Sequence, residues 1–154
     1  MKTVLVFNKG IIFMKLIRSQ EVPADIVREP GAKQATIKRL IDTTDGADRF
    51  VLSLFELRPN GSTPPHYHEW EHEVFILEGA MQLLLPHEEK AVDLQAGDVV
   101  FIPRNEPHGF ATSSDQTCRF LVVAPTERPP IRNYFLSEEA YQFDGALEST
   151  VAKM

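Results

Sequence analysis

The sequence predicts an all-β fold, a sandwich or barrel built from short strands. Between Gln34 and Val123, segments rich in β-branched and aromatic residues alternate with regular turn signals. Almost none of these segments shows the helical spacing of apolar residues that an amphipathic helix requires. The 11 prolines among 154 residues also exclude a helical bundle.

Four pairs of expected strands lie on either side of short turns. Gly, Asp and Ser mark these turns, because they accept the backbone conformations that reverse the chain. The pairs are Ala35–Ile41 and Arg49–Arg58, Glu73–Leu77 and Met81–Leu85, Lys90–Leu94 and Val99–Ile102, and His108–Thr112 and Thr117–Val123. We expect the strands of the last two pairs to meet across their turns.

The two ends of the chain lie outside this pattern. Apolar runs at Thr3–Phe7 and Ile11–Leu16 flank a turn triplet and predict an N-terminal β-hairpin. After the proline-rich stretch Pro125–Pro130, Ser137–Ala140 begins a predicted short helix that Asp144-Gly145 would end. The expected division is residues 1–18 for the hairpin extension, 19–125 for the barrel and 126–154 for a tail packing on the barrel.

Composition and charge narrow the classes of function. Hydrophobic residues make up 43% of the chain, enough for a core, and 16 basic against 22 acidic residues give a net charge of −6. A protein of this sign repels phosphate backbones and anionic lipids, so we expect neither nucleic acid nor a membrane as a partner. Cys118 is the only cysteine, which rules out an intrachain disulfide and favours a cytoplasmic location.

Four of the five histidines lie between His66 and His108. On a strand His66 and His68 point to one face, and His72 shares their parity. His108 follows a later turn and can reach the same face from a neighbouring strand. Neutral imidazole is the commonest metal ligand, and four such rings buried without an ion would leave polar nitrogens unpaired. The spacing therefore predicts a metal centre of these four histidines and excludes His87, which lies in a turn.

The same residues resemble the two motifs of the cupin superfamily. The first motif has a glycine, a His-x-His pair, a third ligand and a closing glycine; here these are Gly61, His66, His68, His72 and Gly79. The second has a glycine, a proline and a histidine; here these are Gly97, Pro103 and His108. Asn105 and Thr112 stand where the second motif usually has glycine and often has asparagine, and neither is a ligand position. The resemblance covers roughly residues 37–124.

The third ligand has an alternative in Glu73, since many cupins use glutamate there. Counted forward from His68, Glu73 fits the spacing, whereas His72 fits when counted back from the closing glycine. Parity favours His72, which shares a face with Val74. A bulge at residues 69–71 would bring Glu73 inward instead.

The resemblance implies a double-stranded β-helix, the jelly-roll barrel of cupins, with one bound divalent transition metal. The stretch His66–His72 is similar to a four-histidine subgroup of small single-domain cupins that bind manganese or a related ion. Iron, nickel, copper and zinc also suit imidazole ligands. Four neutral ligands would leave both positive charges of the ion uncompensated, which favours an anionic or chelating oxygen ligand. The family habit also implies a homodimer.

Side chains near the histidines are expected to line a small-molecule pocket. Arg119 marks the outward face of its strand, so residues of the opposite parity face inward. The expected pocket residues are Trp70, Phe110, Cys118, Phe120 and Val122. No inward-facing Asp, Glu or Lys is evident, so we expect the metal rather than a side-chain base to carry the chemistry.

Different classes of function compete on this pattern. The first is a metal-dependent enzyme, above all an oxygenase of small organic substrates, with isomerase, epimerase and decarboxylase activities also known among cupins. The second is a non-catalytic module that uses the metal to bind or sense a small molecule. A closed structural zinc site comes third, because it would leave no open coordination position.

Overall fold

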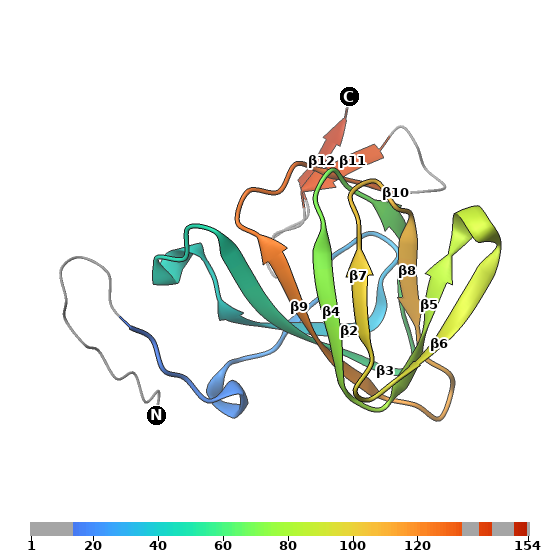
Figure 1. Cartoon of the computed structure of the whole chain (residues 1–154), viewed down its shortest axis with the longest axis horizontal. Coiled ribbons are helices and arrows are strands. Elements are labelled where there is room, and N and C mark those ends of the chain that lie inside the picture. Colours follow the sequence, from blue (N-terminus) through green and yellow to red (C-terminus); the bar gives the residue numbers. More distant parts are fainter. Residues whose placement is uncertain (1–13, 134–138, 143–149, 154) are drawn as a thin grey trace.

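The structure is a computed structural model, and it describes residues 14–133, 139–142 and 150–153 (Figure 1). Almost all of its regular structure is β-strand, as expected. The strands are β1 (Asp25–Ile26), β2 (Lys33–Ile41), β3 (Phe50–Tyr67), β4 (His72–Glu78), β5 (Ala80–Leu85), β6 (Lys90–Gln95), β7 (Val99–Ile102), β8 (His108–Ala111), β9 (Cys118–Pro125), β10 (Ile131–Asn133), β11 (Glu139–Gln142) and β12 (Thr150–Lys153). The short 3-10 helices are η1 (Ser19–Glu21), η2 (Thr43–Asp45) and η3 (Pro86–Glu88).

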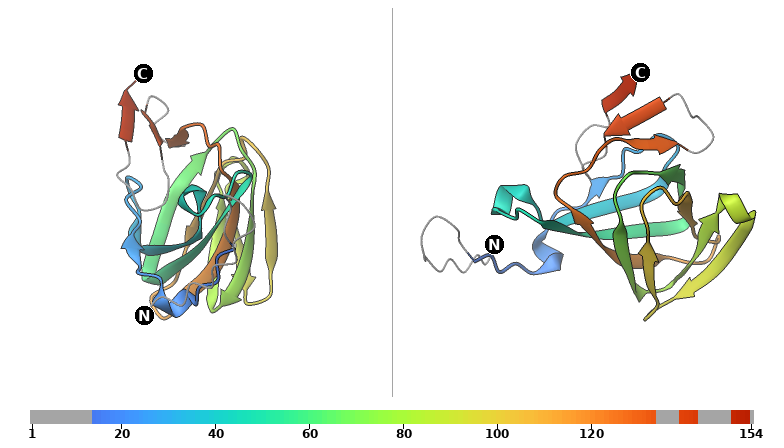
Figure 2. Two further views of the ribbon diagram at one scale, coloured as in Figure 1. Left: turned by 90° about the vertical axis from the view of Figure 1, so that its left-hand side faces the viewer. Right: turned by 45° about the horizontal axis from the view of Figure 1, so that its top comes forward.

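Strand β3 belongs to both faces of a curled antiparallel sheet. Its first half pairs with β2 and β9, and β9 continues to β4 and then β7. Its second half pairs with β8, which continues to β5 and β6, and with β10. Figure 2 shows the strands curling around a common interior. The result is the predicted jelly-roll barrel, closed around one core.

Alternation along the strands fills that core. Strands β4 and β9 each bury every second residue, the period expected of a sheet with one face inward. The core is a single cluster of buried apolar side chains, Val27, Ala35, Ile37, Leu57, Val74, Ile76, Met81, Leu83, Leu94, Ile102, Phe110, Cys118, Phe120 and Val122. Arg119 is half-buried beside buried Cys118 and Phe120, which confirms the inward parity predicted for that strand.

Strand β3 extends nine residues beyond the predicted end at Arg58, from residue 59 to residue 67. Its pairing with β8 is irregular between Thr63 and His66, where Pro64 and Pro65 lie. Proline has no N–H to donate to a neighbouring strand, so it is tolerated at such a bulge. The extension carries His66 into the barrel on a strand rather than on a loop.

Two of the expected hairpins are wrong in their pairing, although all eight strands expected between residues 35 and 123 exist. Val99–Ile102 agrees to the residue, but it pairs with β4, whereas β6 pairs with β5. Likewise, β8 pairs with β3 and β5 and has no ladder with β9. The turns after β6 and β8 therefore carry the chain from one face of the barrel to the other. These connections have the composition of hairpin turns, because a turn that reverses the chain needs the same residue types whether or not its two strands pair.

The C-terminal tail corrects the helix prediction. Glu139–Gln142 forms strand β11, which pairs with β10 and with β12. Pairing with the edge strand β10 satisfies backbone groups that a short isolated helix would have left to water. These strands lie together at one end of the barrel (Figure 1). Ser137, Glu138 and the predicted Asp144-Gly145 stop lie outside the described residues.

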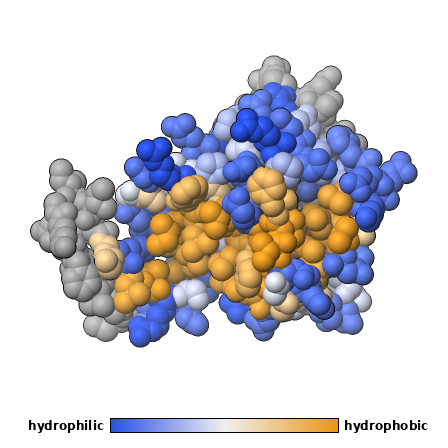
Figure 3. All heavy atoms as spheres, viewed as in Figure 1, coloured by the Kyte–Doolittle hydropathy of each residue, from blue (hydrophilic) through white to orange (hydrophobic). Residues whose placement is uncertain are grey.

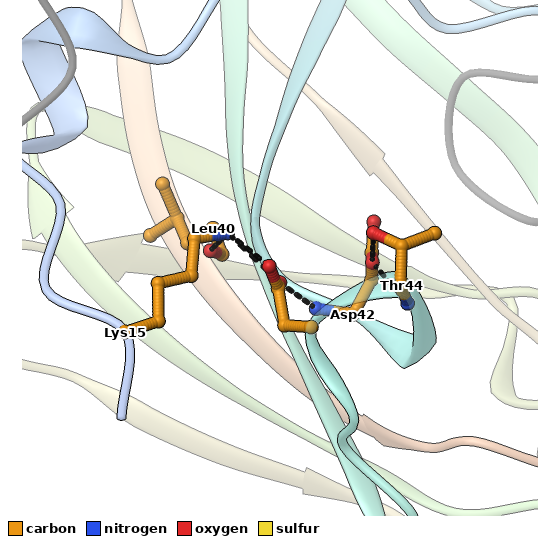
Figure 4. Close-up of polar contacts among 5 residues, drawn as sticks. Lys15, Leu40, Asp42 and Thr44 are labelled. Atoms are coloured by element: carbon orange, nitrogen blue, oxygen red, sulfur yellow. Dashed lines mark hydrogen bonds and ion pairs between the residues drawn. The ribbon is translucent and has the colours of Figure 1, made fainter. Parts of the chain in front are cut away.

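Most of the expected N-terminal hairpin, residues 1–13, also lies outside the described residues, and residues 14–16 are not in a strand. Lys15 ties this segment to the barrel, because its ammonium donates to the carbonyl oxygen of Leu40 at 3.0 Å and to the Asp45 carboxylate at 2.8 Å. Asp42 caps η2 by accepting from the Thr44 N–H (Figure 4).

Among the described residues, no helix has the length and apolar character needed to span a bilayer.

The outer face of β4 and β7 is apolar. Phe75, Leu77, Val99 and Phe101 are each at least 42% exposed there. Phe75 and Val99 are direct neighbours in the β4–β7 ladder. Figure 3 shows hydrophobic side chains gathered on the side of the molecule where these strands lie. Such a contiguous patch is typical of an interaction surface.

Candidate metal centre

The four predicted histidines come from four places in the fold and meet inside the barrel. His66 lies on β3, His68 directly follows that strand, His72 begins β4 and His108 begins β8. His66 and His108 are direct partners in the β3–β8 ladder. All four side chains are buried, with exposures between 1% and 9%.

The imidazole rings surround a common centre. Ring centroids are 4.6 Å apart for His66 and His108, 5.1 Å for His68 and His108, 5.0 Å for His68 and His72, and 4.9 Å for His72 and His108. Nitrogen atoms of His66, His68 and His108 lie within 4.8 Å of one another. The nitrogens of these three residues are close enough to share one ion, and the His72 ring lies beside them without being part of that group.

Hydrogen bonds at Nδ1 decide which nitrogens face that centre. The Nδ1 atoms of His68 and His108 lie 2.6 Å and 2.7 Å from the carbonyl oxygens of Trp70 and Glu106. A carbonyl oxygen only accepts, so both rings carry their proton on Nδ1 and keep a lone pair on Nε2. The Nδ1 of His66 contacts the carboxylate of Glu29 in the same way.

The Nε2 atoms left over fit a metal ion. Those of His68 and His72 are fully buried without a hydrogen-bond partner. Those of His66 and His108 lie 3.1 Å apart, and in the tautomer set by Nδ1 both present lone pairs. Buried lone pairs without a donor are costly, and a cation at their centre removes the cost. The donor set therefore fits a divalent transition metal.

Burial keeps these rings in the neutral form that binds metal. It lowers the pKa of His68 to about 3, and the charge of His66 contributes to the lowering. Burial also holds the pKa values of His72 and His108 well below 6.5, again with contributions from the neighbouring histidines. No proton therefore competes for the Nε2 atoms of His68, His72 and His108 at neutral pH.

The structure distinguishes His72 from the alternative Glu73. His72 is buried with Val74 and Ile76 on the inner face of β4, whereas Glu73 is exposed on the outer face. The backbone from residue 69 to residue 71 makes a bend and returns the chain to β4 without reversing the parity that the sequence indicates. The imidazole, not the carboxylate, joins the cluster.

Two turn residues explain the motif positions around the cluster. Gly79 has φ +79°, and a Cβ there would lie 1.8 Å from the carbonyl oxygen of Thr117, so no other residue fits. Asn105 has φ +64°, a left-handed conformation that asparagine tolerates better than most residues. Its N–H donates to the carbonyl oxygen of His68 at 2.7 Å. The substitution of Asn for the usual glycine is thus compatible with the turn.

A cavity of about 90 Å³ opens beside the histidines, room for several water molecules or a small ring. Its walls come from β2, β3, β4, β8, β9 and β10 and from the segments next to them. The lining residues are Glu29, Ile37, Arg39, Asp42, Val51, Ser53, Phe55, Thr63, His66, Trp70, His72, Phe110, Phe120, Val122, Ala124, Arg128 and Ile131. Phe120 packs against Phe55 and Phe110, with ring centroids 5.4 Å and 5.3 Å away. The wall is mostly apolar and partly aromatic.

Four of the five predicted pocket residues line this cavity, and Cys118 does not. Cys118 is fully buried in the core, where burial raises the pKa of its thiol to about 11. It lies at the start of β9 opposite Leu57, away from the cavity end of that strand. Trp70 stacks on His68 and donates from its indole N–H to the carbonyl oxygen of Pro129 at 3.1 Å. It thus covers the His68 ring and holds the chain after β9.

The expectation that no acidic side chain faces the pocket is wrong. Glu29 and Asp42 both line the cavity, as do the cations Arg39 and Arg128. Burial acts to raise the pKa of Asp42, but hydrogen bonds from Thr44 and the charges of Lys15 and Arg39 together lower it. The sequence does not predict Glu29 and Asp42 as pocket residues because both lie next to turns outside the histidine motifs. The one sequence signal for Glu29 is the Pro-Gly pair that follows it.

Comparisons with known proteins agree with this site. Residues 53–124 match the family model described as a cupin domain. The polyketide cyclase RemF from Streptomyces resistomycificus shares 63% identity with this chain and has a TM-score of 0.79, with 81% of this chain and 88% of that chain covered. A comparison with curated proteins gives no match.

More distant structures share the barrel. A predicted oxalate decarboxylase from Thermotoga maritima has 26% identity and a TM-score of 0.62, covering 71% of this chain and 97% of that chain. A sugar phosphate isomerase from Silicibacter pomeroyi has 19% identity and a TM-score of 0.67, covering 86% and 89%, a likeness of fold alone. From its motifs, its barrel and these relatives, the chain belongs to the cupin superfamily.

Proposed function

We propose that this protein is a metal-dependent polyketide cyclase, an enzyme that closes rings on a chain of alternating carbonyl and methylene groups. The observation that carries the proposal is the 63% identity to a polyketide cyclase over 88% of that protein. The buried histidine cluster beside an aromatic cavity supports it, because the reaction needs both a polarising centre and an apolar enclosure.

The residues that would hold the metal are His66, His68, His72 and His108. The Nδ1 contacts of His66, His68 and His108 leave the Nε2 lone pairs of these rings available, and the Nε2 atoms of His68 and His72 are buried without a partner. A divalent ion bound there would act as a Lewis acid on a substrate carbonyl oxygen, which acidifies the adjacent C–H bond.

The cavity wall supplies binding and shape. Phe55, Phe110 and Phe120 form a continuous aromatic surface against which a flat, conjugated segment can stack. Arg39 and Arg128 place guanidinium groups in the same wall, where they can donate to carbonyl or enolate oxygens. The cavity admits a segment of about one ring, and its enclosure would bring the reacting carbons of that segment together and exclude bulk water.

The proposed reaction needs no oxidant. A methylene carbon loses a proton and attacks a carbonyl carbon in the same chain, so one C–C bond forms while the carbonyl oxygen takes up a proton. Loss of water then gives the conjugated ring. The oxygenase hypothesis drawn from the sequence requires O₂ instead, so the two functions differ in a measurable reactant.

The test is incubation of the metal-loaded protein with a synthetic linear poly-β-ketone, following ring formation by absorbance and mass spectrometry together with O₂ concentration. We expect ring formation faster than the spontaneous reaction, products lighter by water, and constant O₂. Consumption of O₂ with oxygen-containing products would overturn the proposal in favour of an oxygenase.

Matched variants tie the activity to the cluster. His72→Ala removes a proposed ligand, and Glu73→Ala changes the neighbouring exposed residue on the other face of β4. We expect the first variant to fall to the spontaneous rate and the second to keep the parental rate. Parental activity in His72→Ala would mean that ring closure does not depend on the metal centre.

A further inference from the structure

Glu29 is a carboxylate buried inside the barrel wall. Its residue exposure is 4%, and it lines the cavity beside the histidine cluster. Its carboxylate contacts Nδ1 of His66, a residue 37 positions later in the chain. Burial of a carboxylate is costly unless it is hydrogen-bonded or paired, so this contact is a specific feature of the fold.

A tight turn delivers Glu29 to this position. The Ala32 N–H donates to the Glu29 carbonyl oxygen at 2.9 Å, and Gly31 between them has φ +91°. Proline followed by glycine at the centre of a turn is the signature of type II, which requires positive φ at the glycine. The turn seats against Pro64, because a Cβ on Gly31 would lie 3.4 Å from the Pro64 ring.

The contact makes His66 different from two of the other histidines. His68 and His108 donate from Nδ1 to neutral backbone carbonyl oxygens, two residues away in each case. His66 has a negatively charged acceptor from a distant part of the chain. A carboxylate on the far nitrogen holds the ring more firmly and increases electron density at the metal-facing nitrogen.

We propose that Glu29 is a positioning residue of the metal centre, which acts through His66 and compensates part of the charge of the bound ion. It fixes the ring with Nε2 toward the other three imidazoles. It also places one negative charge next to a ligand set that is otherwise neutral. This inference rests on the proposed metal centre, not on the identity of the reaction.

The test measures metal binding without substrate. Purified metal-free protein is titrated with Co²⁺, and the dissociation constant and the visible absorption spectrum of the bound ion are recorded. Glu29→Gln keeps an acceptor oxygen and the shape of the side chain but removes the charge, whereas Glu29→Ala removes both. Glu73→Gln is the matched control, because it neutralises an exposed carboxylate next to the ligand His72.

We expect Glu29→Ala to bind Co²⁺ about 10–100-fold more weakly than the parent. Glu29→Gln should show a smaller loss of affinity, and Glu73→Gln should keep the parental affinity. A shifted absorption spectrum in Glu29→Gln would show an altered ligand field that a purely structural role does not produce. Circular dichroism of the metal-free variants identifies any that fail to fold, in which case the Gln variant decides.

Parental affinity and spectrum in both Glu29 variants would overturn the inference. The result is independent of the cyclase proposal: failure of ring closure with intact Co²⁺ binding would leave the role of Glu29 standing. Conversely, if both Glu29 variants bind Co²⁺ with the parental affinity and still close rings, the proposed role of Glu29 is wrong and the cyclase proposal stands.

Discussion

The indole ring of Trp70 lies flat on the imidazole of His68, with ring centroids 3.5 Å apart and planes inclined by 7°. Trp70 is the only tryptophan in the chain. Its fluorescence therefore reports on one place, the edge of the histidine cluster. Because open-shell ions quench nearby excited states, we expect Cu²⁺ or Co²⁺ to reduce the emission strongly at one equivalent. A fluorescence titration measures this, and a chelator should restore the signal. Equal quenching in His72→Ala would contradict binding at the cluster.

The identity of the third ligand is open to direct measurement. We expect His72→Ala and His108→Ala each to lose most of the bound metal, because each removes one buried donor nitrogen. Glu73→Ala should retain it, since that carboxylate faces solvent. Elemental analysis of the purified proteins gives the occupancy. Full occupancy in His72→Ala would exclude His72 as a ligand.

The stability of the metal-free protein should fall with acid. The pKa values of His68, His72 and His108 are lowered in the folded chain, so below their unfolded value of 6.5 the unfolded chain binds protons that the folded chain does not. Their stabilisation is complete above pH 6.5 and is lost as pH falls toward the folded value, about 3 for His68. We expect a loss of about 2 kcal/mol per ring between pH 7.5 and pH 5.

Urea unfolding of the metal-free protein at several pH values measures this loss. His72→Gln, which has no titrating ring, should show a weaker pH dependence than the parent. A free energy of unfolding that is equal at pH 5 and pH 7.5 would contradict the lowered pKa values. Because the pKa values of these histidines are lowered, we expect protons to displace the metal only at a pH below 6.5, the value for an ordinary histidine.

Gly79 should tolerate no side chain. We expect Gly79→Ala to lose more than about 4 kcal/mol of stability or to fail to fold, because the added Cβ would collide with the backbone at Thr117. Gly97→Ala is the matched control: its φ is also positive, +93°, but nothing lies within 4 Å of the added atom. Conformational strain alone should cost about 1–2 kcal/mol there. Equal losses in urea unfolding would contradict the steric argument.

The apolar outer face of β4 and β7 is where we expect a second copy of the chain to bind. Phe101→Glu places a second negative charge on that face, opposite Glu73 and two residues from Val99 in the β4–β7 ladder. We expect a dimer for the parent and a monomer with unchanged metal content for the variant, measured by light scattering after gel filtration. Ile26→Glu, exposed on β1, is the control and should stay dimeric. A monomeric parent would contradict the expected homodimer.

The sequence predicted the parts that depend on local alternation. The parity of His72 with Val74, and of Phe120 with Val122, follows from the period of a strand, and the structure has the same parity. Parity does not say which strands are neighbours, so turn composition alone predicts hairpins after β6 and β8, where the structure has connections between the two faces. Glu29 lies 37 residues before its partner His66, and only the seating of a turn against Pro64 brings them together.

Strand β3 carries two different kinds of residue on one piece of backbone. Val51, Ser53 and Phe55 in its first half line the cavity, and His66 in its second half joins the cluster. Between the two halves, the Thr112 hydroxyl donates to the Arg58 carbonyl oxygen at 2.6 Å. We therefore expect exchange of Val51, Ser53 or Phe55 to change which molecules the cavity accepts while the backbone that carries His66 stays in place.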